Sequence, residues 1–452
     1  MLHLRQPSQC PAFFGALALT TVAVASTPPP HTPLHPLPPR YVVTAIEHPE
    51  PNTVRTIVPW DLNDDGRVAG FAFHGYGIDL TRQPCFWQDG VVELVPVDWD
   101  YTESRCLATD GTAFGIDLTS EALVHVTPDG IAPIATAPVG YSTMLRPAMA
   151  SGWVVGNHYD DGFTWHPDAG YTALSTPFSS NPATVADVNE AGVAVGTFDY
   201  SRAFMWRHGE GRTDPAPELS GETHAWSIDE LGRVLLSHQQ SAAAFVRYGY
   251  LGDDGVSLGP VLMTFPYGQG VEARANEAGD LVGTWASGSG TPHMAMRAAA
   301  GSELVEIALP PDTIAVDVYG LTEAGMAYGL IMNSEYEPEG FVASVTGGLS
   351  ILNHRLIGHE PLWFYGVPRD ANASGAMVIT YAHNNSYSHW AMIEPARLGD
   401  VDGDGVIDVS DVLGVVDAWG PWPPGSVCGP DLDMDGVVGV VDLLEVLAAF
   451  GG

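Results

Sequence analysis

One motif recurs along most of this chain, from residue 41 to residue 397 of its 452 residues. The clearest copy, residues 186–197, reads Ala-Asp-Val-Asn-Glu-Ala-Gly-Val-Ala-Val-Gly-Thr and is followed by an aromatic pair at Phe204 and Trp206. The glycine after the Asn-containing segment marks eight copies, which are at Gly66, Gly111, Gly152, Gly192, Gly232, Gly279, Gly325 and Gly375. Their spacing of 40 to 50 residues constrains the fold most strongly, because repeats of this length build solenoids or propellers.

Each copy reads as four short strands. An apolar segment ends in Asn or Asp, the chain turns at the glycine, and an alternating Val-x-Gly segment returns. The third strand carries the aromatic pair, and the fourth has a pattern such as Leu-Ser-Ile at residues 349–351. Four strands of about five residues fit into this repeat length. The sequence therefore predicts an all-β fold, a β-propeller of about eight four-stranded blades, with seven blades as the alternative.

The two ends of the repeat region predict how such a ring closes. The eighth copy has a third strand at residues 389–393 but continues to Asp400 without a fourth strand. Residues 41–46, Tyr-Val-Val-Thr-Ala-Ile, precede the first copy and belong to none. An N-terminal strand that completes the last blade would remove the open edge, so we expect these two segments to share one sheet.

The motif resembles the extracellular HAF repeat, which is named for a His-Ala-Phe segment before a tryptophan. Residues 202–206, Arg-Ala-Phe-Met-Trp, match it with Arg in place of His. Residues 293–296, His-Met-Ala-Met, keep the His without the aromatic residues. The resemblance implies secretion and a repeat fold rather than a particular reaction.

The end of the chain contains a second, different duplication. Residues 400–411 and residues 431–442 align at an offset of 31. In both segments Asp stands at positions 1, 3, 5 and 12, and Gly stands at position 6. Oxygen ligands at these positions, with a sharp glycine turn and a backbone carbonyl at position 7, are what a Ca²⁺ loop requires. The sequence therefore predicts two Ca²⁺ ions near the carboxyl end.

An apolar helix follows each predicted loop. Apolar residues at helical spacing run from Val412 to Trp419, their counterparts run from Leu443 to Phe450, and a glycine ends each run. Prolines precede both loops, so no helix enters them. Two loop–helix halves of this kind resemble the type I dockerin, which implies a small α-helical calcium-binding module in residues 398–452.

The dockerin resemblance also implies a ligand set and a partner surface. The implied ligands of the first loop are Asp400, Asp402, Asp404, the carbonyl of Val406, Asp408 and Asp411. Those of the second loop are Asp431, Asp433, Asp435, the carbonyl of Val437 and Asp442, with water in place of a side chain at Gly439. The first loop has one more carboxylate, so we expect it to bind Ca²⁺ more tightly.

Loop positions ten and eleven help dockerins to select a cohesin, and here they are Val409, Ser410, Val440 and Val441. The usual Ser/Thr pair is absent from the second half. The resemblance therefore implies a cohesin-like or cell-envelope partner, while Val440 and Val441 could equally dock onto the propeller of the same chain.

The charge balance and the N-terminus bear on partners and location. The chain has 54 acidic and 17 basic residues, all of the basic ones Arg, and a net charge of −37, so nucleic acids and anionic membranes are not expected partners. Arg5 precedes an apolar stretch at residues 13–24, which is too short to span a bilayer, and residues 23–25 form a small-x-small cleavage site. We expect a signal peptide at residues 1–25, a Pro-rich linker at 26–40, the propeller at 41–397 and the module at 398–452.

After cleavage no transmembrane segment is expected, and the protein would be secreted or lie at the cell surface. In that compartment Cys85 and Cys106 could either form a disulfide bond or stay free.

No catalytic constellation stands out. A GxSxG elbow in a strand–helix context, an HExxH pair and a phosphate-binding loop are all lacking. Carboxylates recur in the repeat at Asp61, Asp110, Asp187, Asp229 and Asp370, where they could line a channel. They stand at an Asx position whose side chain caps a turn, so a structural role is favoured and no catalytic residue is assigned.

The tryptophans divide into two groups. Trp87, Trp165 and Trp206 recur beside a phenylalanine, which predicts packing between blades. The expected surface platforms are Trp60, Trp99, Trp153, Trp226 and Trp285.

These features predict a secreted, non-catalytic repeat protein whose dockerin-like tail binds calcium and attaches it to a cohesin-like or cell-surface partner. The alternatives are a dockerin-borne polysaccharide hydrolase or lyase and a carbohydrate-binding propeller. Whether the chain is an enzyme stays open, and a non-enzyme is favoured.

Overall fold

The computed structural model describes residues 40–47, 54–74, 81–97, 102–108, 110–120, 122–136, 143–146, 151–158, 161–174, 182–240, 243–252, 255–266, 269–299, 303–357, 366–382, 388–422, 429–433 and 436–450. The predicted signal peptide, the linker up to residue 39, Trp99, Cys428 and Asp435 lie outside this part of the chain.

Most of the described chain consists of short strands in groups of four. The first four groups are β2(Val54–Leu62), β3(Val68–His74), β4(Thr81–Gln88) and β5(Val91–Leu94); β6(Thr102–Leu107), β7(Ala113–Asp117), β8(Ala122–Thr127) and β9(Gly130–Thr136); β10(Thr143–Arg146), β11(Val154–His158), β12(Asp161–His166) and β13(Gly170–Ala173); and β14(Ala183–Val188), β15(Val193–Phe198), β16(Arg202–Arg207) and β17(Gly211–Thr213). Within each group successive strands pair antiparallel.

The later groups follow the same plan. They are β18(Glu222–Ile228), β19(Arg233–Gln240), β20(Ala243–Gly252) and β21(Gly255–Pro266); β22(Gln269–Ala275), β23(Leu281–Ala286), β24(Pro292–Arg297) and β25(Val305–Ile307); β26(Thr313–Leu321), β27(Ala327–Asn333), β28(Pro338–Ser344) and β29(Gly348–Ile351); and β31(Val367–Ala371), β32(Met377–Ala382) and β33(Ser388–Pro395) with β1(Tyr41–Ala45). A 3₁₀ turn at Leu352–Arg355 leads into β30(Leu356–Ile357).

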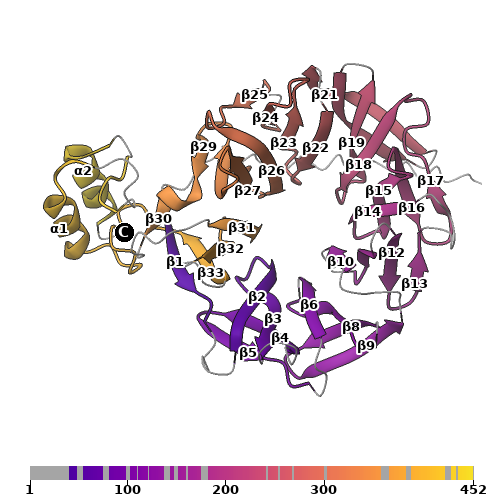
Figure 1. Cartoon of the computed structure of the whole chain (residues 1–452), viewed down its shortest axis with the longest axis horizontal. Coiled ribbons are helices and arrows are strands. Elements are labelled where there is room, and N and C mark those ends of the chain that lie inside the picture. The colour runs from indigo at the N-terminus through magenta and orange to yellow at the C-terminus, as the bar shows by residue number, and fades with distance from the viewer. Residues whose placement is uncertain are drawn as a thin grey trace, which may run out of the picture. The chain divides into compact units, whose positions relative to one another are not determined.

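The small sheets succeed one another around a ring, and the first strand of each group lies nearest its centre (Figure 1). A hydrophobic cluster fills each junction between neighbouring groups. The cluster that joins the last group to the first contains Ile57 and Trp87 together with Val378 and Trp390. This arrangement of small antiparallel sheets is that of a β-propeller. The third and fourth groups are also linked by one parallel pair, Asp161 with Ala183, so they form a single eight-stranded sheet that the sequence did not predict.

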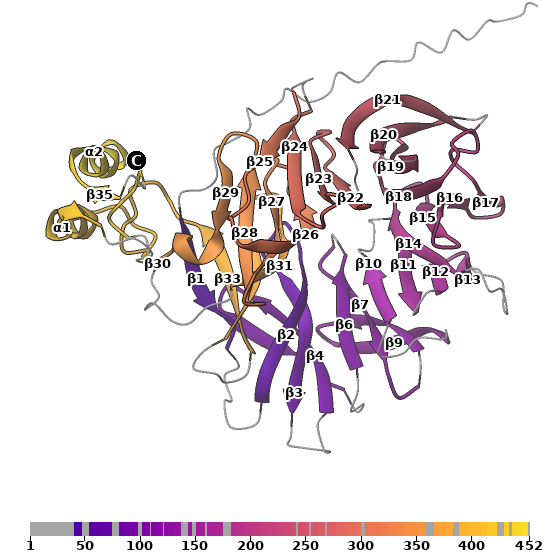
Figure 2. The ribbon, with the colours of Figure 1, turned by 45° about the horizontal axis from the view of Figure 1, so that its top comes forward.

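The N-terminal strand completes the last sheet, as the sequence predicted. β1 pairs antiparallel with β33 from Tyr41 opposite Pro395 to Ala45 opposite Ala391. On its other side β1 pairs parallel with β30, where Tyr41 lies opposite Leu356. Tyr41 is fully buried in the junction between the seventh and eighth groups. The two ends of the repeat region therefore meet in one sheet (Figure 2).

The turn glycines explain why the motif repeats. All eight marker glycines have a positive φ, between 71° at Gly192 and 90° at Gly279, which a residue with a side chain adopts only at a cost. In the preceding segment Asn63 accepts hydrogen bonds from the N–H groups of Asp65 and Arg67. This is an Asx turn, and it agrees with the prediction that the chain turns at the marker glycine.

The aromatic pairs pack between sheets, as predicted. Trp87, Trp165 and Trp206 are buried in three different junctions. Trp60 is exposed and Trp226 is half-buried, in line with the prediction of surface platforms. The same prediction is wrong for Trp153 and Trp285, which are buried because neighbouring rings cover them. Cys85 and Cys106 are both buried, and no disulfide bond joins them.

The C-terminal residues form two similar halves around a small core. Helix α1(Val409–Asp417) follows the first loop and α2(Val440–Ala449) follows the second, and a short antiparallel pair, β34(Gly420–Pro421) with β35(Val437–Val438), links them. The core contains Val401, Val415, Leu432, Val438 and Val446. Both helices begin three residues earlier than the apolar pattern indicated. The extra turn begins at Asp408 and Gly439, which act as N-caps.

Candidate metal centre

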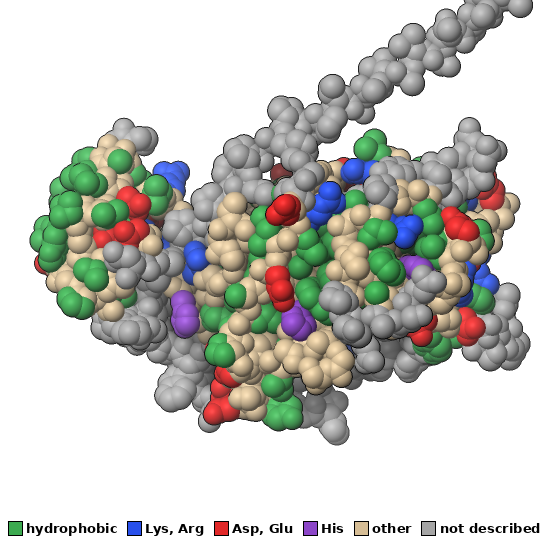
Figure 3. Space-filling view, turned by 90° about the horizontal axis from the view of Figure 1, so that it is seen from above, with side chains coloured by type: hydrophobic (Ala, Val, Ile, Leu, Met, Phe, Trp, Pro, Cys, Tyr) green, Lys and Arg blue, Asp and Glu red, His purple; other side chains and the backbone are tan. Residues whose placement is uncertain are grey.

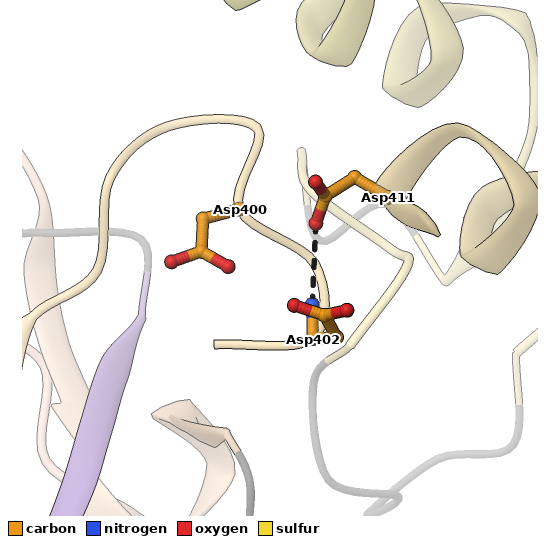
Figure 4. Close-up of side chains that lie close together, drawn as sticks. All are labelled: Asp400, Asp402 and Asp411. Atoms are coloured by element: carbon orange, nitrogen blue, oxygen red, sulfur yellow. Dashed lines mark hydrogen bonds between the residues drawn. The ribbon is translucent and has the colours of Figure 1, made fainter. Parts of the chain in front are cut away.

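Two acidic clusters lie at the predicted calcium loops. One ligand oxygen from each of Asp400, Asp402 and Asp411 lies within 4.8 Å of the others, and the same holds for Asp431, Asp433 and Asp442. Figure 4 shows the carboxylates of Asp400, Asp402 and Asp411 gathered between the loop and the start of α1. Folding therefore brings together side chains at positions 1, 3 and 12 of each loop.

The same backbone hydrogen bonds hold both clusters in place. The carboxylate of Asp411 accepts from the N–H groups of Val401 at 2.6 Å and Asp408 at 2.7 Å. Thirty-one residues later, the carboxylate of Asp442 accepts from Leu432 at 2.6 Å and Gly439 at 2.7 Å. The position-12 aspartate thus closes its own loop and caps its own helix, and this fixes the direction of its carboxylate.

The glycine turns let the loops fold tightly around these carboxylates. Gly405 and Gly436, at position 6, have φ values of 83° and 84°. Their N–H groups donate to the position-1 carboxylates of Asp400 and Asp431 at 3.0 and 3.1 Å. A residue with a side chain would strain this turn, so glycine is required at this position.

Burial makes these clusters electrostatically costly. Asp400, Asp411, Asp431 and Asp442 are each less than 5% exposed. Buried carboxylates that lie close together repel one another, and a cation between them offsets this repulsion. Burial raises the pKa of Asp402, and the nearby charges of Asp404, Asp411 and Asp400 raise it further. A divalent cation would reverse this effect, because it favours the ionised form.

The remaining implied ligands lie at the rim of the clusters. Asp404 is exposed, and its carboxylate accepts from the N–H of Val406 at 2.8 Å. Asp408 is exposed and caps α1 through the N–H of Ser410 at 2.6 Å. Val406 and Val437, whose carbonyls stand at position 7, are both exposed.

The implied partner residues lie on an exposed apolar surface of the module. Val409, Val440 and Val441 are each more than half exposed, and Ser410 is exposed beside them. Further exposed apolar side chains of the two helices, and of the residues just after them, are Leu413, Val416, Trp419, Leu444, Leu447 and Phe450. Hydrophobic side chains gather at the left of Figure 3, over this module. Of the periodic residues that predicted the helices, Val412 and Leu443 pack against the core and the others are exposed, while Val415 and Val446 are fully buried.

Carboxylates of the repeat play two different structural roles. Asp110 and Asp229 cap their own turns, as predicted, by accepting from the N–H groups of Thr112 and Arg233. Three others reach the next group instead, and their amide donors are Leu107 for Asp61 (2.6 Å), Ile228 for Asp187 (3.0 Å) and Leu62 for Asp370 (2.7 Å). For these three the predicted turn-capping role is incomplete, because each carboxylate joins two neighbouring sheets.

The ring also contains a small cavity and one Gly-x-Ser-x-Gly sequence. A cavity of about 170 Å³ lies between the fifth and sixth groups and is lined by Glu222, His224, Trp226 and Glu272, among others. Trp226 donates a hydrogen bond from Nε1 to Ser237 Oγ at 2.8 Å. Residues 255–259 spell Gly-Val-Ser-Leu-Gly, but they lie within strand β21 rather than in a strand-to-helix turn.

Arg40 and Glu445 are site residues that the sequence did not single out. Burial raises the pKa of Glu445, and Asp433 and Asp442 raise it further, whereas Arg40 lowers it. Glu445 stands in the helix that follows the second loop, three residues after Asp442. Helical spacing could have indicated it, but its counterpart in the first half is Gly414, so the internal repeat concealed it.

Comparison with known proteins gives a fold-level likeness. The chain matches no family model, and no curated protein matches it. Among solved structures, it is similar to the β-propeller domain of the Trilobed protease from Pyrococcus furiosus, with 10% identity, a TM-score of 0.40, and coverage of 67% of this chain and 98% of that one. It is also similar to an oligogalacturonate lyase in complex with manganese, with 11% identity, a TM-score of 0.42, and coverage of 74% and 99%.

A third similar structure is the acylaminoacyl peptidase from Pyrococcus horikoshii, with 9% identity and a TM-score of 0.39. The match covers 75% of this chain and 59% of the peptidase, so the chain spans little more than half of that protein's length. Among the described residues, no helix combines the length and apolar character that crossing a membrane requires.

These neighbours correct the function that the sequence predicted. The prediction of a non-catalytic repeat protein that attaches through a dockerin-like tail is wrong, since the similar solved structures are those of two peptidases and a lyase. The repeat spacing indicates a fold, and a fold does not determine whether a protein is an enzyme. The lack of known catalytic motifs does not determine it either. The comparisons also give no support to a cohesin-like or cell-envelope partner.

Proposed function

We propose that residues 398–452 bind two Ca²⁺ ions, one in each loop, and that they do so on an eight-bladed propeller in an exported protein. The observation that carries this proposal is the pair of buried aspartate clusters with matching hydrogen bonds at an offset of 31 residues. The resemblance to a type I dockerin supports the same assignment, since its position-specific ligands coincide with these clusters.

The oxygen set suits a hard cation of moderate size. In the first loop the ion would be held by Asp400, Asp402, Asp404, Asp408, Asp411 and the carbonyl of Val406. Ca²⁺ accepts six to eight oxygen ligands in flexible geometry, whereas Mg²⁺ demands a stricter octahedron. When bound, the ion supplies positive charge that neutralises the buried carboxylates, so the protein's own residues no longer repel one another.

An extracellular location fits the proposal. The predicted signal peptide at residues 1–25 would place the module where calcium is abundant, and extracellular modules commonly bind it with dissociation constants of roughly 10⁻⁴ to 10⁻³ M. Moderate affinity would then be sufficient to keep both loops occupied.

Calorimetric titration of the chelator-treated full chain with CaCl₂ tests the proposal. We expect two binding events, the tighter one in the first loop. Asp411→Asn should weaken that event at least about 100-fold, because it removes a position-12 carboxylate oxygen. Asp442→Asn should weaken only the second event.

Asp417→Asn is the matched control. It makes the same change of charge in the same helix, α1, at an exposed position outside the acidic cluster. It should leave both events unchanged. Titrations without a heat of binding, or equal losses in all three variants, would refute the assignment.

A further inference from the structure

Arg40 connects the N-terminal closing strand to both halves of the C-terminal module. This side chain is fully buried although it is an arginine. Its Nη2 donates to the carbonyl oxygen of Asp400 at 2.8 Å, and its Nη1 donates to the carbonyl of Gly429. Asp400 is the first residue of loop one, and Gly429 lies two residues before Asp431, the first residue of loop two.

The backbone of Arg40 belongs to the ring. Its carbonyl oxygen accepts a hydrogen bond from the N–H of Ala396 at 2.9 Å, which extends the β1–β33 ladder by one step. The next residue, Tyr41, starts β1. One residue therefore has its backbone in the closing sheet and its guanidinium in the module.

Loop one also packs against the closing strand. A Cβ atom added to Gly403, at position 4 of the loop, would lie 3.6 Å from Val42 Cγ2 and 3.7 Å from Ile357 Cβ. Val42 and Ile357 are paired residues of β1 and β30. The backbone of the predicted calcium loop thus lies over the two strands that meet at the closure.

We infer that calcium binding in the module strengthens the closure of the ring through Arg40. This inference rests on the proposed calcium site. Asp400 contributes its carboxylate to the acidic cluster and its carbonyl to Arg40, so an ion that fixes loop one also fixes the acceptor of the guanidinium. Without the ion, repulsion among the aspartates favours an open loop, and the buried guanidinium loses its acceptors at a cost in stability.

Linkage makes the effect measurable at a distance from the metal. A ligand that binds only the folded arrangement stabilises every contact that depends on that arrangement. Amide hydrogen exchange reports such contacts locally. Residues 41–45 and 391–395 form the closing ladder, and none of them belongs to a calcium loop.

The test is amide hydrogen exchange of the full chain, measured once in about 5 mM CaCl₂ and once in excess chelator. A calcium concentration of this order saturates extracellular sites. We expect calcium to slow exchange of the closing-ladder amides by about tenfold or more in the wild-type chain. In Arg40→Met, calorimetry should still detect two calcium ions, but the calcium-dependent protection of the ladder should disappear.

Arg207→Met serves as the control, because this partly exposed arginine lies in β16 on another part of the ring and contacts Glu210. It should keep the wild-type response. If Arg40→Met does not fold, the wild-type comparison with and without calcium still decides whether calcium strengthens the closure.

Three results would overturn the inference. Calcium that binds without changing ladder exchange would leave the proposed calcium site standing and refute the coupling. Protection that persists in Arg40→Met would remove Arg40 from the mechanism. An absence of calcium binding would refute both proposals together.

Discussion

Single carboxylates hold neighbouring sheets of this ring together. Asp61, Asp187 and Asp370 each accept a hydrogen bond from a backbone N–H of the next group. Asp370 also accepts a hydrogen bond from Oη of Tyr328, in the seventh group, at 3.2 Å. Hydrogen bonds to a charged acceptor stabilise a fold by about 1.5–3 kcal/mol each, so these aspartates matter for the junctions between sheets.

The half-buried pair Asp61 and Asp370 gives the closing junction a pH dependence. Burial raises the pKa of Asp61, and the neighbouring Asp370 raises it further. Above the pKa of an unfolded aspartate, about 3.9, the folded ring then binds more protons than the unfolded chain. The free energy of unfolding that this group contributes is full at low pH and falls as the pH rises through the raised pKa.

Urea unfolding at pH 5 and pH 8 checks this expectation. Asp61→Asn lacks the titrating proton, so the wild-type chain should lose stability relative to this variant as the pH rises. Asp229→Asn is a comparison at a carboxylate that caps its own turn. If the free energies of unfolding of the wild-type chain and Asp61→Asn depended on pH in the same way, the raised pKa of Asp61 would be contradicted.

Among the elements, the closing strand β1 has the largest consequence for stability. It adds five residue pairs to β33 and buries Tyr41 in the junction between the seventh and eighth groups. A chain that begins at Val54 lacks this strand and exposes the edge of β33. We expect its melting temperature to fall by at least about 10 °C relative to a chain that begins at Arg40, with a less cooperative transition in calorimetry. A superimposable transition would show that the ring does not depend on β1.

Local signals predicted the strands, turns and buried aromatic residues well. A glycine with positive φ and an Asx turn are local features, and each copy of the motif contains both. The inter-sheet bonds of Asp61 and Asp187 were missed, because their partners Leu107 and Ile228 lie 46 and 41 residues away. No local pattern reports contacts over such separations.

The helices of the module show a second limit of periodicity. Apolar spacing located α1 and α2, but it does not determine which of their apolar residues are buried. In the structure Leu413 and Leu444 are exposed, while Val415 and Val446 are buried against Val401 and Leu432. Two short helices enclose only a small core, so the rest of their apolar surface stays outside.

At the scale of the whole molecule, Arg40 joins the ring to a module that is rich in carboxylates. The net charge of −37 leaves few cations to balance buried acidic groups. Arg40 contacts the module through backbone carbonyls and leaves the carboxylates of Asp400, Asp402 and Asp411 facing one another. An external cation is the simplest balance for that charge. We therefore expect bound calcium to balance the negative charge of the duplicated loops in this acidic chain.

Native mass spectrometry of the intact chain tests this central claim most directly. Spectra recorded after equilibration with a small excess of CaCl₂ should show two bound calcium ions per chain, one ion in Asp411→Asn or Asp442→Asn, and none in the double variant. A wild-type spectrum that retains the mass of the metal-free chain would contradict the account.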